Sequence, residues 1–109
     1  MEEQSVLKAL TALSQAHRLR VFRALVVAGQ AGLTPGQIAE AQQIPAATLS
    51  FHLKELVQAG LLTQERQGRS LIYRADFAQM NSLLGYMTEH CCQGGVCEVT
   101  ESPFTCASC

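Results

Sequence analysis

The sequence predicts a mainly α-helical domain with a single β-hairpin. Two helices of about two and four turns, joined by a tight turn, are expected in the middle of the chain. Directly after them the hydrophobic period changes to that of short strands, and a last helix keeps heptad spacing. A strand pair placed behind the second helix of a helix-turn-helix is a wing. The predicted fold class is therefore a winged helix-turn-helix.

Size and composition limit the function classes. The chain has 109 residues, 48% of them hydrophobic, and a formal net charge of -1, which fits one compact domain with a short tail. Such a small core favours association through an exposed apolar helix face. Its longest weakly polar stretch, residues 24–33, is too short to span a bilayer. The first residues are acidic where an export signal is basic, so we expect a cytoplasmic protein.

A first helix is expected over residues 5–14, and a second one over residues 16–27, where Gly29 would end it. The predicted inward positions are apolar: Val6, Leu7, Leu10 and Leu13 in the first helix, and Leu19, Phe22, Leu25 and Val26 in the second. The arginines of the second helix, Arg18, Arg20 and Arg23, are expected to face solvent.

The helix-turn-helix itself begins at a recognisable cap. Thr34, Pro35 and Gln37 form the pattern of a capping box, and this helix is expected to end near Gln42. A stronger helix follows the turn 43–45 and runs to Ala59. Its inward positions are Leu49, Leu53, Leu56 and Val57, and its outer positions are Ala47, Ser50, Phe51 and Lys54.

Short β-leaning runs at residues 61–66 and 70–74 flank Gln67-Gly68-Arg69, which predicts a hairpin with a basic tip. Asp76 and Gln79 predict the start of a last helix. Its heptad positions are Phe77, Met80, Leu84, Met87 and then Cys91. We expect residues 1–92 to form the domain and residues 93–109 to form a flexible, cysteine-rich tail.

The near-zero total charge hides two regions of opposite sign. Residues 17–74 hold 7 lysines and arginines against 3 acidic residues, whereas residues 75–109 hold 4 acidic residues and no lysine or arginine. All 5 cysteines lie in residues 91–109. Since the local field decides DNA affinity, the basic segment suits phosphate contacts. The odd cysteine count in a chain not expected to be exported favours thiol chemistry or metal binding over disulfides.

These elements resemble the ArsR/SmtB family of metal-responsive repressors, which are small winged helix-turn-helix dimers. The resemblance rests on Leu10–Leu13 followed by His17–Val21, on the capped segment 33–41, and on Ser50–Leu56 running into Ala59–Leu62. It implies that Pro45–Ala59 is the recognition helix, that Gln64–Arg74 is the wing, and that the first and last helices pair across a homodimer. Two-fold symmetry then implies double-stranded operator DNA with an inverted repeat.

The implied DNA-binding residues are Ala47, Thr48, Ser50, Phe51, His52, Lys54, Arg66 and Arg69. Thr48 and Ser50 suit base edges or phosphates, Lys54 suits a phosphate, and the wing arginines suit the backbone or minor groove. Phe51 stands where the family often has arginine, so an apolar thymine contact would replace a basic one. His52 lies between the two faces, which leaves a half-buried histidine and a phosphate contact both open.

Founding members of the family carry cysteine ligands on the first helix of the helix-turn-helix, but Gly36–Gln42 has none. An arsenite-responsive subgroup instead has a cysteine pair after the last helix with a third cysteine close behind, and Cys91, Cys92 and Cys97 are similar to that. Three thiolates suit pyramidal As(III) or Sb(III). The predicted function is a homodimeric repressor, not an enzyme, that releases its operator when the metalloid binds.

Three other interpretations of these cysteines stay open. Zinc or cadmium would need a fourth ligand, for which His90, Cys106 or Cys109 are available. The cysteine pair could instead act as a thiol oxidation sensor on the same scaffold, or be reactive but unliganded. A thiol enzyme fits least, because Cys106 and Cys109 have no βαβ unit around them.

Overall fold

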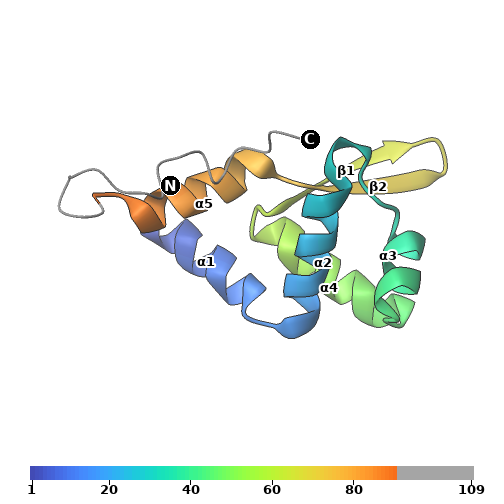
Figure 1. Ribbon diagram of the computed structural model, residues 1–109. Coiled ribbons are helices and arrows are strands. Elements are labelled where there is room, and N and C mark those ends of the chain that lie inside the picture. The colour runs from blue at the N-terminus through green and yellow to red at the C-terminus, as the bar shows by residue number, and fades with distance from the viewer. Residues whose placement is uncertain (91–109) are drawn as a thin grey trace.

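A computed structural model describes residues 1–90, and it confirms the winged helix-turn-helix (Figure 1). The elements are α1 (Glu3–Leu13), α2 (Ala16–Ala28), a 3-10 turn η1 (Gly29–Ala31), α3 (Pro35–Gln42), α4 (Ala46–Gln58), β1 (Leu62–Gln67), β2 (Ser70–Ala75) and α5 (Phe77–Thr88). The predicted tail, residues 93–109, and all the cysteines lie outside the described residues. Within residues 1–90, no helix is long and apolar enough to cross a membrane.

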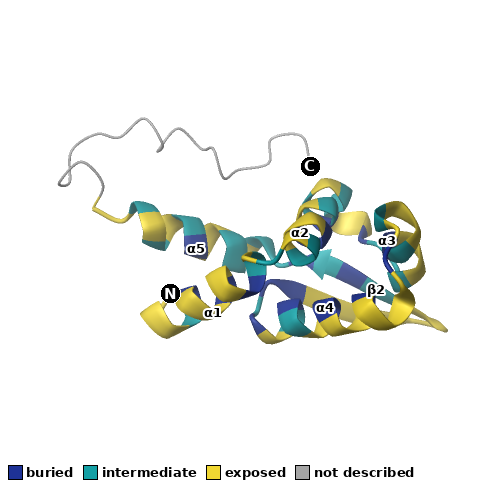
Figure 2. Cartoon of the chain, turned by 90° about the horizontal axis from the view of Figure 1, so that it is seen from below, coloured by how far each residue is buried: buried dark blue, intermediate teal, exposed yellow. Residues whose placement is uncertain are grey.

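The core forms where α2 and α4 meet each other and the base of the hairpin (Figure 2). Its largest fully buried side chains are Leu25, Ile38, Leu49, Leu53, Leu56, Leu61 and Val21. Three of them, Leu49, Leu53 and Leu56, lie on one face of α4, as their helical spacing predicts. This packing fixes the rotation of α4 and so decides which side chains its outer face presents.

The helix ends form as the sequence predicts. Thr34 and Gln37 make a complete capping box at α3, in which the Gln37 amide donates to the Thr34 hydroxyl over 3.2 Å. The Asp76 carboxylate accepts a 3.0 Å bond from the Gln79 amide at the start of α5. At the end of α2, Gly29 adopts φ +64°, a conformation that favours glycine.

The hairpin pairs Leu62 with Ala75 at its base and Gln67 with Ser70 at its tip. Gly68, with φ +63°, opens the two-residue loop between the strands. The structure adds one pairing that the sequence did not predict: Leu33 exchanges two backbone hydrogen bonds with Tyr73, of 3.0 and 2.8 Å. This bridge ties the start of the helix-turn-helix to the wing.

Some predicted inward positions were wrong. Leu7, Leu10 and Leu19 are 51%, 38% and 42% exposed. The inward positions of α1 are instead Val6, Ala9 and Ala12, and Val21 replaces Leu19 in α2. The small side chains of Ala9 and Ala12 let α1 approach its neighbours closely, so the leucines are left on the opposite side.

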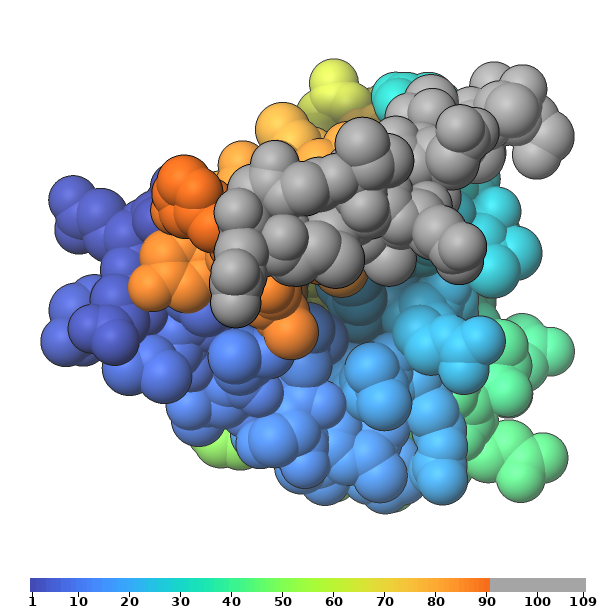
Figure 3. Space-filling view, turned by 60° about the vertical axis from the view of Figure 1, so that its left-hand side comes forward, coloured from blue at the N-terminus to red at the C-terminus, as the bar shows by residue number. Residues whose placement is uncertain are grey.

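The exposed leucines Leu7 and Leu10 of α1 and the exposed Met87 of α5 leave apolar side chains on the two helices that pack together at one end of the molecule. Figure 3 shows this end, with the N-terminal residues beside α5. The described part of the chain, residues 1–90, therefore leaves apolar side chains exposed there.

The Leu33–Tyr73 bridge depends on a glycine. At Gly32, φ is +66° and an added Cβ would lie 2.6 Å from the Tyr73 carbonyl oxygen. We expect Gly32→Ala to lower the free energy of unfolding by about 2–3 kcal/mol, because a strained backbone is combined with a backbone clash. Urea denaturation followed by circular dichroism measures it.

Gly29→Ala is the matched control, because Gly29 has a similar φ but open space around its Cβ position. It should cost only the conformational penalty of a non-glycine residue in this backbone region, about 1 kcal/mol, at the low end of the usual range. Equal losses in the two variants would show that the close approach to Tyr73 contributes nothing.

Candidate nucleic-acid interface

The outer face of α4 presents a mixed polar and aromatic surface. Its exposed residues include Ala47, Thr48, Ser50, Phe51 and Lys54. Phe51 is 55% exposed, which is unusual for so large an apolar side chain on a helix whose other face is packed. Hydroxyls, an aromatic ring and an ammonium thus project from one rigid helix, positioned by the leucines behind them.

The wing lies beside this face and forms a groove with it. The groove has a volume of about 440 Å³, and its lining includes Ser50 and Lys54 of α4, Gln64 of β1 and Leu71 of β2. Pro35, at the start of α3, lines the same groove. The structure therefore brings two of the predicted contact residues together with the wing.

Two wing arginines are exposed, and a third is engaged in holding the wing in place. Arg66 on β1 and Arg69 in the hairpin loop are exposed. The Arg74 guanidinium donates to the Glu65 carboxylate and to the Gln30 carbonyl, each over 2.7 Å. The hydrogen bond from Arg74, with a smaller one from Gln67, lowers the pKa of the Glu65 carboxyl. Arg74 is thus neutralised, and the wing is tied to the segment before α3.

The exposed cations are spread along the α4–wing side. Lys54, Arg66 and Arg69 make no ion pair with any residue of the described part of the chain. Glu65, the acidic residue on the wing, is already paired with Arg74. The charge left for a partner on this side is therefore positive, as phosphate binding requires.

His52 does not belong to this surface. It is only 6% exposed, so the structure favours the buried alternative of the two that the sequence left open. The Nδ1 atom of its ring lies 3.4 Å from Nη1 of Arg18, and its ring centroid lies 5.7 Å from that of His17. Since arginine only donates, Nδ1 accepts and the neutral ring carries its proton on Nε2.

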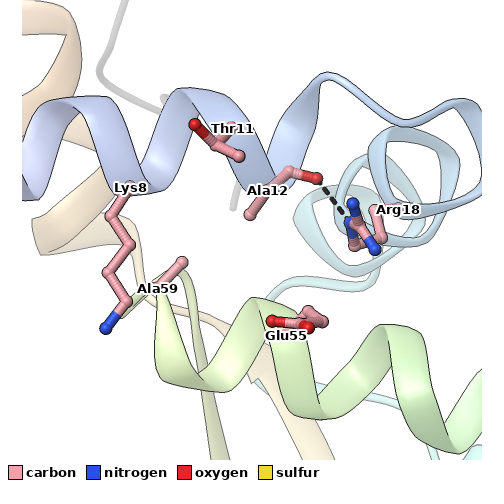
Figure 4. Close-up of a pocket in the computed structure, with 6 residues that line it drawn as sticks. All are labelled: Lys8, Thr11, Ala12, Arg18, Glu55 and Ala59. Carbon is pink, nitrogen blue, oxygen red and sulfur yellow. Dashed lines mark hydrogen bonds between the residues drawn. The ribbon is translucent and has the colours of Figure 1, made fainter.

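Arg18 was expected to face solvent, and this was wrong. It is half-buried, and its Nε donates a 2.8 Å bond to the carbonyl oxygen of Ala12 near the end of α1 (Figure 4). The last carbonyls of a helix lack intrahelical partners and attract cations. In the sequence, Arg18 comes shortly after the predicted end of the first helix, and the helical face on which His52 lies is left open. Together these two features could have indicated that Arg18 turns inward.

No group of three or more histidine, cysteine, aspartate or glutamate residues within residues 1–90 could hold a metal ion. The predicted ligands Cys91, Cys92 and Cys97 lie outside the described residues. Near the end of the described chain, the His90 ring lies 3.8 Å from the Glu89 carboxylate, and both side chains are exposed.

Burial, with smaller electrostatic contributions from Arg18 and His17, lowers the pKa of His52 from 6.5. The folded protein therefore binds this proton less readily than the unfolded chain does. We expect the free energy of unfolding to be fully retained above pH 6.5 and to fall as the pH drops below it, by at most about 1.4 kcal/mol per pH unit. Urea titrations between pH 5 and 8 would measure this slope.

His52→Gln should reduce the slope, because glutamine keeps an acceptor for Arg18 but does not titrate. If His52→Gln kept the parent slope, the pH dependence would come from other groups.

Comparison with known proteins agrees with this geometry. A helix-turn-helix domain family matches residues 13–65, which run from the end of α1 into β1. The comparison with curated proteins found no match.

Several solved structures share the fold. An ArsR-like transcriptional regulator from Rhodococcus sp. RHA1 has a TM-score of 0.69 and 24% identity, over 77% of this chain and 76% of that one. The transcriptional repressor BigR from Xylella fastidiosa has a TM-score of 0.61 and 26% identity, over 82% and 88% of the two chains. A homodimeric winged helix-turn-helix DNA-binding domain from Mycobacterium bovis, described as a possible ArsR-family transcriptional regulator, has a TM-score of 0.63 and 26% identity, over 80% and 81%. The chain therefore carries a helix-turn-helix domain within a winged-helix fold, and its solved neighbours include ArsR-like and possible ArsR-family transcriptional regulators.

Proposed function

We propose that the chain is a homodimeric transcriptional repressor that releases its operator when As(III) or Sb(III) binds Cys91, Cys92 and Cys97. The observation that carries the DNA-binding part is the α4–wing surface. There a packed helix presents hydroxyls, Phe51 and Lys54 beside a wing whose exposed arginines have no acidic partner among the described residues.

The dimensions of α4 suit a major groove. Its 13 residues span about 20 Å, and a B-DNA major groove of about 12 Å width admits one α-helix. With α4 in the groove, Thr48 and Ser50 would reach base edges or phosphates, and Phe51 would contact thymine methyl groups. Arg69, at the tip of the wing, would then reach the backbone or the adjacent minor groove.

Two observations support a homodimer, and the dimer predicts the form of the operator. The apolar residues Leu7, Leu10 and Met87 are exposed on α1 and α5, which pack together. The Mycobacterium bovis neighbour is a homodimer by its description. A two-fold pair of α4 helices would enter successive major grooves about 34–36 Å apart, so the operator would be an inverted repeat.

The repressor role is supported by BigR, a transcriptional repressor that shares 26% identity over 82% of this chain. A repressor needs only to occupy its operator and to leave it on a signal. Both requirements fit a small domain with no additional domain for an enzymatic or activating role in its described part.

The cysteine pattern of the sequence supports As(III) or Sb(III) as the inducer. Soft thiolates select soft ions, and As(III) or Sb(III) takes three sulfurs in a pyramid. Cys91 comes three residues after the end of α5, the helix that packs on α1. Metalloid binding there would act on the helix pair proposed for dimerisation and change the spacing of the two α4 helices. Such coupling between sites is typically about 1–3 kcal/mol.

A second inducer class draws on the same cysteines. Zinc or cadmium would need a fourth ligand. His90, the last described residue, has an exposed ring and could supply it. Thiol oxidation would join the cysteine pair or form a sulfenic acid. Titration of the operator complex with each of these agents separates the alternatives.

The α4–wing surface predicts a specific salt dependence. Lys54→Ala and Arg69→Ala should each weaken operator binding and lower the slope of log affinity against log salt by about 1, because each removes one phosphate contact. Fluorescence anisotropy, on an operator selected from a random duplex library, measures both quantities between 50 and 300 mM salt, a range of about one decade.

Arg74→Ala is the informative comparison, since Arg74 is engaged by Glu65 and the Gln30 carbonyl. It should leave the salt slope near that of the parent. A salt slope lowered by about 1 in Arg74→Ala, but unchanged in Lys54→Ala and Arg69→Ala, would contradict the assignment of the free cations.

The inducer prediction is tested with arsenite on the same operator complex. Arsenite should lower operator affinity by about tenfold, which corresponds to about 1.4 kcal/mol of coupling. Cys91→Ser, Cys92→Ser and Cys97→Ser should each abolish the response without weakening operator binding in its absence. Anisotropy titrations with arsenite, antimonite, zinc, cadmium and peroxide on the four proteins measure this.

Cys106→Ser is the matched control and should respond like the parent. A full arsenite response in Cys97→Ser would contradict the three-sulfur site. A response to zinc or cadmium alone would favour the four-ligand alternative, and a response to peroxide alone would favour the thiol sensor.

A further inference from the structure

A single arginine joins three helices of the domain. Within residues 1–90, both side-chain hydrogen bonds that link one α-helix to another are made by Arg18. Its Nε donates to the Ala12 carbonyl of α1, and its Nη1 donates to Nδ1 of His52 on α4. Its own backbone amide donates to the Gln15 side chain at the start of α2. Apolar side chains of the core cluster surround these bonds.

The surroundings of this link let it influence how α1 and α4 are placed relative to each other. A cleft of about 330 Å³ lies between α1 and α4, and its lining includes Lys8, Arg18 and Glu55 (Figure 4). α1 and α4 also contact each other directly, and Arg18, which lines the cleft between them, adds hydrogen bonds of fixed direction to that contact. Arg18 bridges the cleft by way of α2.

The chemistry of the link makes it directional. A guanidinium is planar and always charged, and its donors point in fixed directions. The Ala12 carbonyl is near the C-terminal end of α1, where partial negative charge accumulates. His52 must stay neutral to accept from Arg18, because a protonated ring would place a hydrogen against the guanidinium. Each bond therefore allows a narrow range of positions.

We infer that Arg18 is a positioning residue for operator recognition, which holds the DNA-reading helix α4 in register with α1 although Arg18 itself contacts no DNA. This inference rests on the proposed DNA binding. His52 follows Phe51 and lies two residues before Lys54, so a shift of His52 moves both of these contact residues. In the proposed dimer, α1 also contributes to the interface, and Arg18 therefore sets where each α4 lies relative to the dimer axis.

The test compares two arginines on the same helix. Arg18→Gln should lower operator affinity by about tenfold, because the side-chain hydrogen bonds to the Ala12 carbonyl and to His52 are both lost. Arg23→Gln removes the same charge from an exposed position of α2 and should change affinity less than about twofold. The salt slope should stay at the parent value in Arg18→Gln, because no phosphate contact is lost.

A spectroscopic readout reports the link itself. Long-range ¹H–¹⁵N spectra give the tautomer and the pKa of His52, whose charged neighbours are Arg18 and His17 on α2. Arg18→Gln should raise the pKa of His52 toward 6.5, and Arg23→Gln should not. His52→Leu should also lower operator affinity, and adding it to Arg18→Gln should lower affinity no further than Arg18→Gln alone, because the Arg18–His52 bond is then already lost.

Several outcomes would overturn the inference. Parent-like affinity in Arg18→Gln, with the His52 signal changed, would show that the link does not control recognition. A salt slope lowered by about 1 would make Arg18 a phosphate contact instead. If Arg18→Gln does not fold by circular dichroism, Arg18→Lys replaces it, because lysine has a single donor atom that cannot reach both acceptors as the Nε and Nη1 of arginine do. Since lysine keeps the charge, operator affinity and the His52 signal then decide between the outcomes. If the parent binds no duplex DNA, the proposed function fails rather than this inference.

Discussion

The burial of one face of α4 is the constraint on which the rest of the structure depends. Leu49, Leu53 and Leu56 insert between α2 and the base of the hairpin and leave no freedom of rotation. Burying three leucines contributes roughly 5–9 kcal/mol of apolar transfer free energy. Turning α4 by one residue would expose part of this set and bury the outer polar residues. The face that meets a partner is thus decided by the face that meets the core.

The apolar core sets the approximate positions of the helices and the wing, and polar interactions fix these positions more closely. Leucine side chains tolerate small shifts, because dispersion contacts are weak singly and not directional. The hydrogen bonds of Arg18 and Arg74 are directional, and each arginine joins elements that are distant in the sequence. Arg18 acts on α1, α2 and α4, and Arg74 acts on the wing and on the segment before α3. Basic residues of this domain therefore divide into those that hold elements in place and those left for a partner.

Local signals in the sequence predicted the fold well. The capping residues Thr34 and Asp76, the glycine at position 29 and the change of period at Leu61 each act within a few residues, so the helices and the hairpin were correctly placed. The inward residues of α1 were wrong because Leu7 and Leu10 obey the same periodicity as a core face. Only tertiary packing shows that Ala9 and Ala12 form the close contacts.

The candidate site was predictable in its exposed part and not in its buried part. Thr48, Ser50, Phe51 and Lys54 follow from the helical period once the leucines are placed. His52 lies at the border between the two faces, so only its contact with Arg18, 34 residues earlier, decides its role. No local pattern contains a contact of that separation. The Leu33–Tyr73 bridge was missed for the same reason.

The arrangement of the domain explains how a signal at one end can act at the other. The exposed leucines of α1 and Met87 of α5 lie at one end, and the groove between α4 and the wing is built from different elements. A packed core transmits small displacements because it is dense and has few alternative arrangements. A change at the end of α5 would act first on α1, since these helices pack together. From α1, the Ala12 carbonyl and Arg18 lead to α4 through bonds that tolerate little displacement, so the proposed inducer would not need to approach the DNA to change its recognition.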